Sequence, residues 1–177
     1  DGPADVFVAP NGDFFVADGY RNSRVVQFSR DGKFIKIIGG TKGSEPGQFN
    51  LPHSVVVDSK GMAWYSNFGE QNIGKFDPKT GKLTEIPMPE LKKGSPIGAL
   101  SIRMDRDENM WLGGMYQAAL WKYNTKTEKL EYWQAPPEWN RPNTQINMTS
   151  PMNIGVDGKV WAQNNGFAGV HRIDLAS

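Results

Sequence analysis

The sequence contains no cysteine among its 177 residues, which excludes disulfide bonds, thiolate metal sites, cysteine nucleophiles and cysteine-linked haem. Long apolar runs are also absent, and none approaches the roughly 18 residues that a membrane-spanning helix needs. Neither sign of charge is in excess, because 20 Lys and Arg residues are balanced by 19 Asp and Glu residues spread evenly along the chain. This mixing argues against a nucleic-acid groove or a polybasic membrane patch.

Helix signals are scarce as well. No stretch combines capping residues with an apolar period of 3.6, and residues 89–93 form at most one turn. No Gly-rich loop follows a strand and opens a helix, so no nucleotide is expected as a cofactor. No haem is expected either, because the cysteines that attach one are missing. Turn-forming residues are abundant instead, with 20 Gly and 12 Pro, which favours many turns between short strands.

A repeat of about 48 residues runs through the chain. An aromatic residue follows the first turn of each copy, at Phe15, Trp64, Trp111 and Trp161. An apolar residue closes the third strand of each copy, at Phe28, Phe76, Tyr123 and Ile173. Both markers recur at intervals of 47 to 50 residues, and two independent markers with the same period indicate a structural repeat.

Each copy has the pattern of an antiparallel meander. Apolar and polar residues roughly alternate within a copy, which is typical of β-strands. The strands are separated by tight-turn pairs, most of which contain Gly, Asn or Asp to supply the positive φ angles that two-residue hairpin loops require. These pairs are Asn11-Gly12, Lys60-Gly61, Glu108-Asn109 and Asp157-Gly158 in the first turn, and Asp31-Gly32, Thr80-Gly81 and Glu128-Lys129 in the second.

The repeat predicts an all-β fold, a β-propeller of about four blades that are each a four-stranded antiparallel meander. The blades are expected at residues 1–40, 51–88, 97–134 and 150–177, in a single domain or propeller fragment spanning 1–177. The fourth copy ends after its third strand, so we expect an incomplete last blade and a larger six- or seven-bladed ring. The recurring aromatic residues are expected to form the core between blades.

Three motifs in the first third of the chain carry a family resemblance: the run Val16–Ser29, Pro46-Gly47-Gln48-Phe49 and Pro52-His53-Ser54. They resemble peptidyl-α-hydroxyglycine amidating lyases and their bacterial relatives with NHL repeats. The resemblance implies that Tyr20 is catalytic and that His53 is one of several His ligands to a zinc ion. It further implies loss of a hydroxyl proton from a carbinolamide, metal polarisation of the substrate and expulsion of the amide.

Residues 52–88 carry a second resemblance, through Pro52-His53, Gly61, Trp64 and the segments 73–75 and 81–87. They look like the repeat of the streptogramin (virginiamycin B) lyase family, which implies a His and Glu cluster around magnesium. Asn67 stands where a Glu would be expected. The positions that match His53 in the other copies are Ala4, Leu100 and Met152. We therefore expect an incomplete catalytic set unless further blades complete it.

Several of these residues have a structural reading as well as a functional one. His53 is either a metal ligand or a hydrogen-bonded residue of the central channel, and Tyr20 either catalyses or packs a loop. Arg21 and Arg24 either hold an anionic substrate group or lie on solvated faces. Asp18, Asn22 and Asn67 offer oxygen atoms to calcium or form Asx turns.

The connector from Trp133 to Thr149 departs most from the repeat. It holds Trp133, Trp139 and Arg141 among several prolines. Tryptophan and arginine are enriched where proteins anchor a partner, and proline lowers the entropy cost of binding. The connector is therefore either a binding surface or a loop folded over the ring with its tryptophans tucked in.

Two functions from different classes follow from these residues. The first is an extracytoplasmic propeller module, periplasmic or secreted, that binds a partner or a small ligand through its rim and loops. The second is a metal-dependent lyase with one zinc, calcium or magnesium ion, completed by blades beyond this sequence. A gluconolactonase-like hydrolase is a third reading. The expected partners are another protein or the remaining blades, with no nucleic acid and no membrane span.

Overall fold

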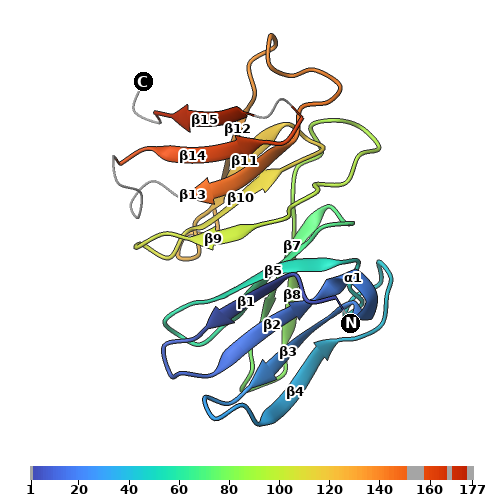
Figure 1. Ribbon diagram of the computed structural model, residues 1–177, viewed down its shortest axis with the longest axis vertical. Helices are drawn as coiled ribbons and strands as arrows, with labels where there is room; N and C mark the ends of the chain where they lie inside the picture. Colours follow the sequence, from blue (N-terminus) through green and yellow to red (C-terminus); the bar gives the residue numbers. More distant parts are fainter. Residues whose placement is uncertain (1, 151–157, 167–168, 175–177) are drawn as a thin grey trace. The chain divides into compact units, whose positions relative to one another are not determined.

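The structure is built from four consecutive antiparallel β-sheets (Figure 1). It is a computed structural model that describes residues 2–150, 158–166 and 169–174. The chain divides into two units, Asp1–Pro89 and Glu90–Ser177, and each unit holds two sheets. In the described part of the chain, no helix is long and apolar enough to cross a membrane.

In the N-terminal unit, both sheets are four-stranded meanders whose strands follow the order of the chain. The strands of the first sheet are β1 (Asp5–Val8), β2 (Phe14–Asp18), β3 (Arg24–Phe28) and β4 (Phe34–Gly39). A one-turn helix that the sequence did not predict, α1 (Gly19–Asn22), joins β2 to β3. The strands of the second sheet are β5 (Pro52–Val57), β6 (Ala63–Asn67), β7 (Asn72–Phe76) and β8 (Leu83–Pro87).

The C-terminal unit repeats the meander, and within the residues that the structure describes its second sheet has three strands. The strands of the third sheet are β9 (Ile102–Met104), β10 (Met110–Gly114), β11 (Ala119–Tyr123) and β12 (Leu130–Gln134). Those of the fourth are β13 (Ile146–Ser150), β14 (Val160–Asn164) and β15 (Gly169–Ile173). This last sheet begins earlier than the expected residue 150, because the end of the segment between Trp133 and Thr149 already belongs to β13.

Five of the seven predicted turn pairs take the left-handed backbone conformation at the glycine that suits it, and the other two take it at a glutamate. Positive φ occurs in all seven predicted pairs, at Gly12, Gly32, Gly61, Gly81, Gly158, Glu108 and Glu128. Five of these residues are glycines, which adopt positive φ without steric cost. Glu108 and Glu128 adopt it at φ 65° and 57°, although a side chain disfavours that region.

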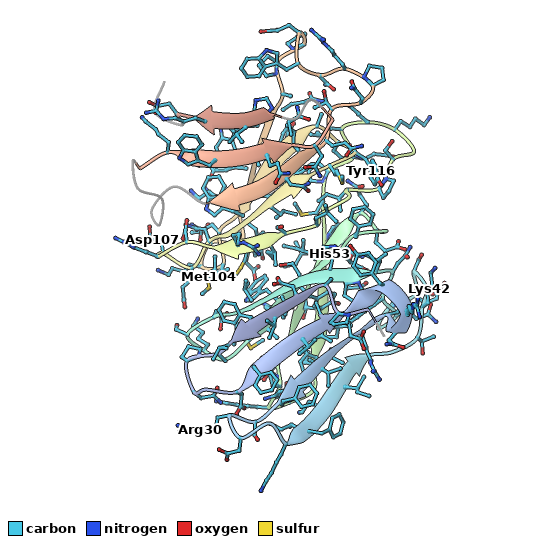
Figure 2. The ribbon with its side chains drawn as sticks, viewed as in Figure 1. Arg30, Lys42, His53, Met104, Asp107 and Tyr116 are labelled. Atoms are coloured by element: carbon cyan, nitrogen blue, oxygen red, sulfur yellow. The ribbon has the colours of Figure 1, made fainter. Side chains whose placement is uncertain are left out.

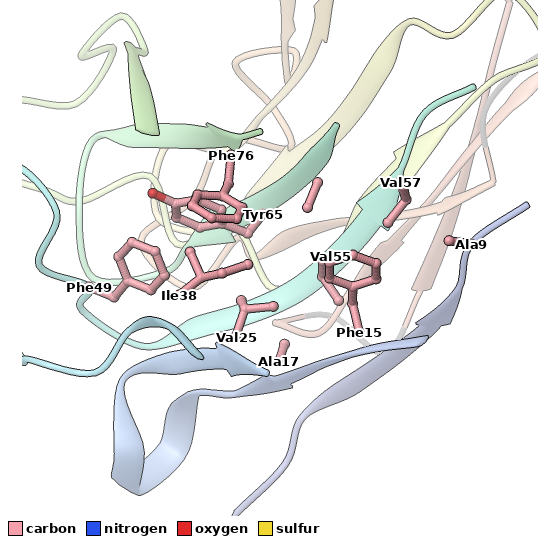
Figure 3. Close-up of a cluster of buried hydrophobic side chains, with 11 residues drawn as sticks. Ala9, Phe15, Ala17, Val25, Ile38, Phe49, Val55, Val57, Tyr65 and Phe76 are labelled. Atoms are coloured by element: carbon pink, nitrogen blue, oxygen red, sulfur yellow. The ribbon is translucent and has the colours of Figure 1, made fainter. Parts of the chain in front are cut away.

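The core of the N-terminal unit lies between its two sheets (Figure 3). Phe15, Ala17 and Val25 of the first sheet pack with Val55 and Tyr65 of the second, and all five are buried. The rings of Phe49 and Tyr65 lie 4.3 Å apart. Face-to-face packing of consecutive sheets is the arrangement that the aromatic repeat predicted.

The opposite face of the first sheet is apolar as well. Cross-strand pairing lines up Val6, Val16, Val26 and Ile37 in one row, and Val8, Phe14, Phe28 and Phe34 in the next. The outer members are exposed, with Val8 at 65% and Phe34 at 61%. Apolar residues on both faces are typical of a sheet with a neighbour on each side.

Trp111 belongs to the core between the two sheets of the C-terminal unit, with Leu120, Ile146, Val160 and Ala162. Trp64 of the second sheet is likewise buried, whereas Trp161 of the fourth is half-buried.

Trp64 and Trp111 are both held by an aspartate six residues earlier in the chain. The indole Nε1–H donates to Asp58 at 2.9 Å in the second sheet and to Asp105 at 2.8 Å in the third. The other carboxylate oxygen of each aspartate accepts backbone N–H groups from the first turn. One carboxylate therefore joins the turn to the core aromatic residue.

The propeller prediction is confirmed at the level of its sheets, since three four-stranded meanders are followed by one in which three strands are described. Met152 and Asp157 lie outside the described residues. Whether the four sheets make one domain, and whether the ring is larger, stay predictions.

Candidate functional site

Tyr20 and His53 meet at one edge of the N-terminal unit, although they are 33 residues apart in sequence. The Tyr20 hydroxyl and His53 Nε2 lie 2.8 Å apart, at hydrogen-bond distance. The two rings meet edge to face with their centroids 5.2 Å apart. Tyr20 is 58% exposed and His53 is half-buried, so the pair is accessible to a ligand. Figure 2 labels His53 near the start of β5.

The turn that carries Tyr20 is organised by Asp18. Its Oδ2 accepts hydrogen bonds from Asn22 Nδ2 and Arg24 Nε, both at 2.9 Å. Burial acts to raise the pKa of Asp18, but these hydrogen bonds and the Arg24 charge outweigh it, so the pKa lies below its ordinary value. Ser23 then takes a left-handed conformation at φ 48° and returns the chain to β3. The charged carboxylate thus fixes both ends of α1.

Gly19 brings this turn against the second sheet. A Cβ atom at Gly19 would lie 2.1 Å from the backbone oxygen of Pro52, so no larger residue fits without displacing β5. Pro52 immediately precedes His53. The glycine of the Asp18-Gly19-Tyr20 motif therefore allows the approach that brings Tyr20 within reach of His53.

His53 stands at an irregularity of β5. Pro52 pairs with Asn67 and Ser54 with Ser66, so His53 is the extra residue between two paired ones. Such a bulge redirects a side chain and is frequent beside functional sites. Here the bulge accompanies an imidazole that faces the Tyr20 phenol. The centroids of the His53 and Phe68 rings lie 6.3 Å apart.

The pair can hold or move one proton between two defined atoms. Either the Tyr20 hydroxyl donates to an unprotonated Nε2, or a protonated Nε2 donates to the phenol oxygen. A group placed against the phenol could therefore exchange a proton with His53 through Tyr20.

A metal site is not formed by these residues alone. Within residues 2–150, 158–166 and 169–174, no three His, Asp or Glu side chains are close enough together to hold a metal ion. His53 Nε2 is already at hydrogen-bond distance from Tyr20. The imidazole could supply at most one ligand here, and a catalytic zinc ordinarily has three from the protein.

The other predicted residues of this unit have defined positions. Arg24 pairs with Asp18, and Arg21 is exposed in the last turn of α1. Asn67 is only 1% exposed; its Oδ1 accepts the backbone N–H of Asn50 at 2.8 Å and its Nδ2 donates to Asn72. Its amide therefore holds loop and strand together.

The remaining predicted residues, Trp133, Trp139 and Arg141, lie in the C-terminal unit. Trp133 stacks on Trp111 with ring centroids 5.6 Å apart. Trp139 is 48% exposed and lies 5.1 Å from the His171 ring. Both tryptophans line a cleft of about 330 Å³. Arg141 Nε donates to the backbone oxygen of Glu138, within the connector.

Trp133 belongs to β12, and its ring is packed on Trp111 of the same sheet, whereas Trp139 is half-exposed at a cleft. A binding role for the connector stays a prediction. The sequence left Asp18 open between a calcium ligand and a turn residue, and the structure shows its carboxylate organising the turn. Sequence reasoning missed Gly19 as the contact residue and His171 beside Trp139, because both contacts join segments far apart in the chain.

Three comparisons agree with the sequence resemblances. A family model described as NHL repeat matches residues 1–28, which include Tyr20. NHL repeat-containing protein 3 from Homo sapiens is 38% identical over 84 residues, covering 46% of this chain and 24% of that protein. Peptidyl-glycine alpha-amidating monooxygenase B from Xenopus laevis is 42% identical over 88 residues, covering 47% of this chain and 10% of that protein. The matches span a quarter or less of these relatives.

A solved structure extends the similarity to nearly the whole chain. Catalytically inactive virginiamycin B lyase from Staphylococcus aureus, in a structure with quinupristin, matches with a TM-score of 0.64 at 12% identity. The match covers 99% of this chain and 56% of that one. It shows the fold alone: this chain is a partial propeller of about four blades, similar in fold to a lyase propeller. In sequence, part of the chain is similar to NHL repeats and to an amidating monooxygenase.

Proposed function

We propose that this protein is a propeller module that binds a small polar ligand at the Tyr20–His53 pair. The supporting observation is the accessible Tyr20 hydroxyl held 2.8 Å from His53 by a turn fixed on both sides. A phenol and an imidazole can donate to or accept from hydroxyl, carbonyl and amide groups of a ligand. Arg21, exposed on the same turn, could attract an anionic group of that ligand.

A second candidate is a lyase acting on peptidyl-α-hydroxyglycine substrates, favoured by the hydrogen bond between the two residues that the resemblance implies. Tyr20 would take the hydroxyl proton of the carbinolamide and pass a proton to His53. The carbon–oxygen double bond would form as the carbon–nitrogen bond breaks, and the released amide nitrogen would take up a proton. Any zinc, calcium or magnesium ion would need ligands beyond the described residues, with His53 contributing one.

One probe tests both candidates. N-benzoyl-α-hydroxyglycine contains the amide, hydroxyl and carboxylate groups discussed above, and its cleavage releases benzamide and glyoxylate. We expect it to shift the His53 imidazole signals in an NMR titration, and Tyr20→Phe to weaken binding about tenfold. Tyr116→Phe is the matched control, because Tyr116 is an exposed tyrosine of the other unit.

The outcomes separate the two candidates. Binding without glyoxylate supports the module, whereas glyoxylate release that Tyr20→Phe and His53→Ala abolish supports the lyase. No shift of the His53 signals at the solubility limit of the probe would reject this site for such ligands. The proposal includes a location outside the cytoplasm, periplasmic or secreted, which fractionation of cells that express the source gene would test.

A further inference from the structure

The first sheet lacks a three-residue unit that the second and third sheets share. In the second sheet, the Trp64 indole donates to the carboxylate of Asp58. The face of the same indole is covered by Lys75 of the neighbouring strand, whose Nζ lies 5.1 Å from the ring centroid. The third sheet repeats the unit with Asp105, Trp111 and Lys122. In both sheets, the unit joins the first turn to the third strand.

The matching positions of the first sheet hold smaller or uncharged residues. Ala9 stands in the place of the aspartate, and Phe15 in the place of the tryptophan. Gln27 pairs with Phe15 across the strands and so takes the place of the lysine. A methyl group and a phenyl ring occupy less volume than a carboxylate and an indole. The first sheet therefore leaves space at positions that the other two sheets fill.

A cleft of about 500 Å³ opens at these three residues. Its other wall comes from the second sheet, through Val57 and the turn residues 58–61. Figure 3 shows Ala9, Phe15 and Val57 together at one end of the core. Both sheets belong to the N-terminal unit, and each has its four strands. The volume lies in the range of sites that bind small molecules.

Gln27 brings a buried amide to this cleft, with only 7% of its surface exposed. Its Nε2 donates to Asp13 Oδ2 at 3.1 Å. Because a carboxylate only accepts hydrogen bonds, this contact fixes which way the amide points. Gln27 Oε1 then has no hydrogen-bond partner among the described residues. An unpaired buried acceptor costs free energy, so a ligand that donates a hydrogen bond to Oε1 is stabilised there.

Three lysines bring positive charge to the cleft. Lys36 is held in place, because its Nζ donates to the backbone oxygen of Pro78 and lies 5.9 Å from the centroid of the Phe76 ring. Lys60 and Lys79 are exposed in turns of the second sheet. Two carboxylates also line the cleft, and both already accept hydrogen bonds from the protein. The exposed lysines therefore favour a ligand with an anionic group.

We propose that this cleft binds a small hydroxylated anion, such as a sugar acid or a sugar phosphate. A hydroxyl group of the ligand would donate to Gln27 Oε1, and its carboxylate or phosphate group would lie against Lys60 and Lys79. The carbon atoms of the ligand would pack against the ring of Phe15, which also lines the cleft. None of the lining residues belongs to the phenol–imidazole pair of the proposed function, so this would be a second ligand site.

Two probes that share hydroxyl groups and differ in their anion test the proposal: glucuronate and glucose-6-phosphate. Glucose is the matched control, because it has the hydroxyl groups but no charge. We expect at least one anionic probe to shift the side-chain amide signals of Gln27 in an NMR titration of the 177-residue protein, with a Kd of about 1 mM or below. Glucose should bind about tenfold more weakly. The tighter of the two anionic probes identifies the anionic group.

Variants separate the groups that hold the ligand. Gln27→Met keeps the length of the side chain but removes its amide, and it should weaken binding about tenfold. Lys60→Ala combined with Lys79→Ala should remove the difference between the anionic probes and glucose. Because both lysines are exposed, this double variant tests the site even if Gln27→Met does not fold. Lys33→Ala combined with Lys42→Ala is the matched control, since both are exposed lysines outside the cleft lining.

Three results would overturn the proposal. Neither anionic probe shifts the Gln27 signals at about 10 mM, tenfold above the expected Kd. Glucose binds as tightly as both anionic probes. The two double lysine variants weaken binding equally.

Discussion

At the scale of single residues, the aspartate–tryptophan pairs show how one side chain can serve both a turn and a core. Asp105 accepts hydrogen bonds from the backbone of its turn, from Asn109 and from the Trp111 indole. The first sheet has Ala9 and Phe15 at the matching positions. The carboxylate acceptor and the indole donor are therefore absent together in that sheet.

Asp105→Ala should therefore lower the free energy of unfolding by about 3 kcal/mol, because it leaves the buried Trp111 indole and the turn amides without their acceptor. Denaturant titration measures the change. Asp107→Ala is the matched control in the same turn, where the side chain is exposed and the expected change is within about 0.5 kcal/mol. Equal losses in both variants would contradict this role for Asp105.

His171 makes stability depend on pH in a predictable direction. Burial lowers its pKa from the ordinary 6.5, because the charged ring is poorly solvated there. As the pH falls below 6.5, the unfolded chain binds more protons than the folded one at this residue, so the stability that His171 contributes decreases. The Asn164 hydrogen bond to Nε2 adds to this effect, since a protonated Nε2 cannot accept it.

We expect His171→Gln to reduce the fall in stability between about pH 7.5 and about pH 5. The measurement is the free energy of unfolding of both proteins at each pH, and the difference between the two curves isolates this histidine. His53→Gln serves as the control for the other histidine of the chain. Parallel curves for the protein and His171→Gln would contradict the assignment.

At the scale of the elements, the turns between third and fourth strands offer a matched pair of positions. Gly81 donates its backbone N–H to Asp77, and Glu128 donates to Asn124 in the same way, both at 2.8 Å. Both residues have positive φ, at 77° and 57°. A Cβ atom at Gly81 would meet nothing within 4 Å. The stability difference between glycine and a larger residue at this position therefore comes from the backbone conformation and not from a steric clash.

Glu128→Gly should therefore raise the free energy of unfolding by up to about 1 kcal/mol, since it relieves the left-handed backbone strain of a non-glycine residue. Gly81→Ala should lower it by about the same amount for the reverse reason. Thermal or denaturant unfolding measures both changes. A loss of stability in Glu128→Gly would show that its side chain contributes more than its backbone conformation costs.

The sequence predicted these elements well because the information for them is local. Strand alternation, turn residues and the recurring aromatic residues identified four sheets. The first and last residues of the first three sheets lie close to those expected. The one-turn helix α1 was missed, since four residues around Tyr20 carry no helical period. The contact between Tyr20 and His53 depends on Gly19 lying against Pro52 of the next sheet, a long-range packing feature that no local pattern encodes.

At the scale of the whole molecule, each unit has its own core between its own two sheets. Trp111 is fully buried, stacks on Trp133 and packs with residues of the fourth sheet. Trp111→Ala should cost about 3–5 kcal/mol of stability, as expected for a large buried aromatic residue. Trp139→Ala, at a half-exposed tryptophan, is the control and should cost less than about 1 kcal/mol.

Amide exchange in Trp111→Ala should accelerate most in β10, β11, β13 and β14, because those strands supply the core around Trp111. Uniform acceleration across all four sheets would instead mean that the cores unfold as one cooperative body.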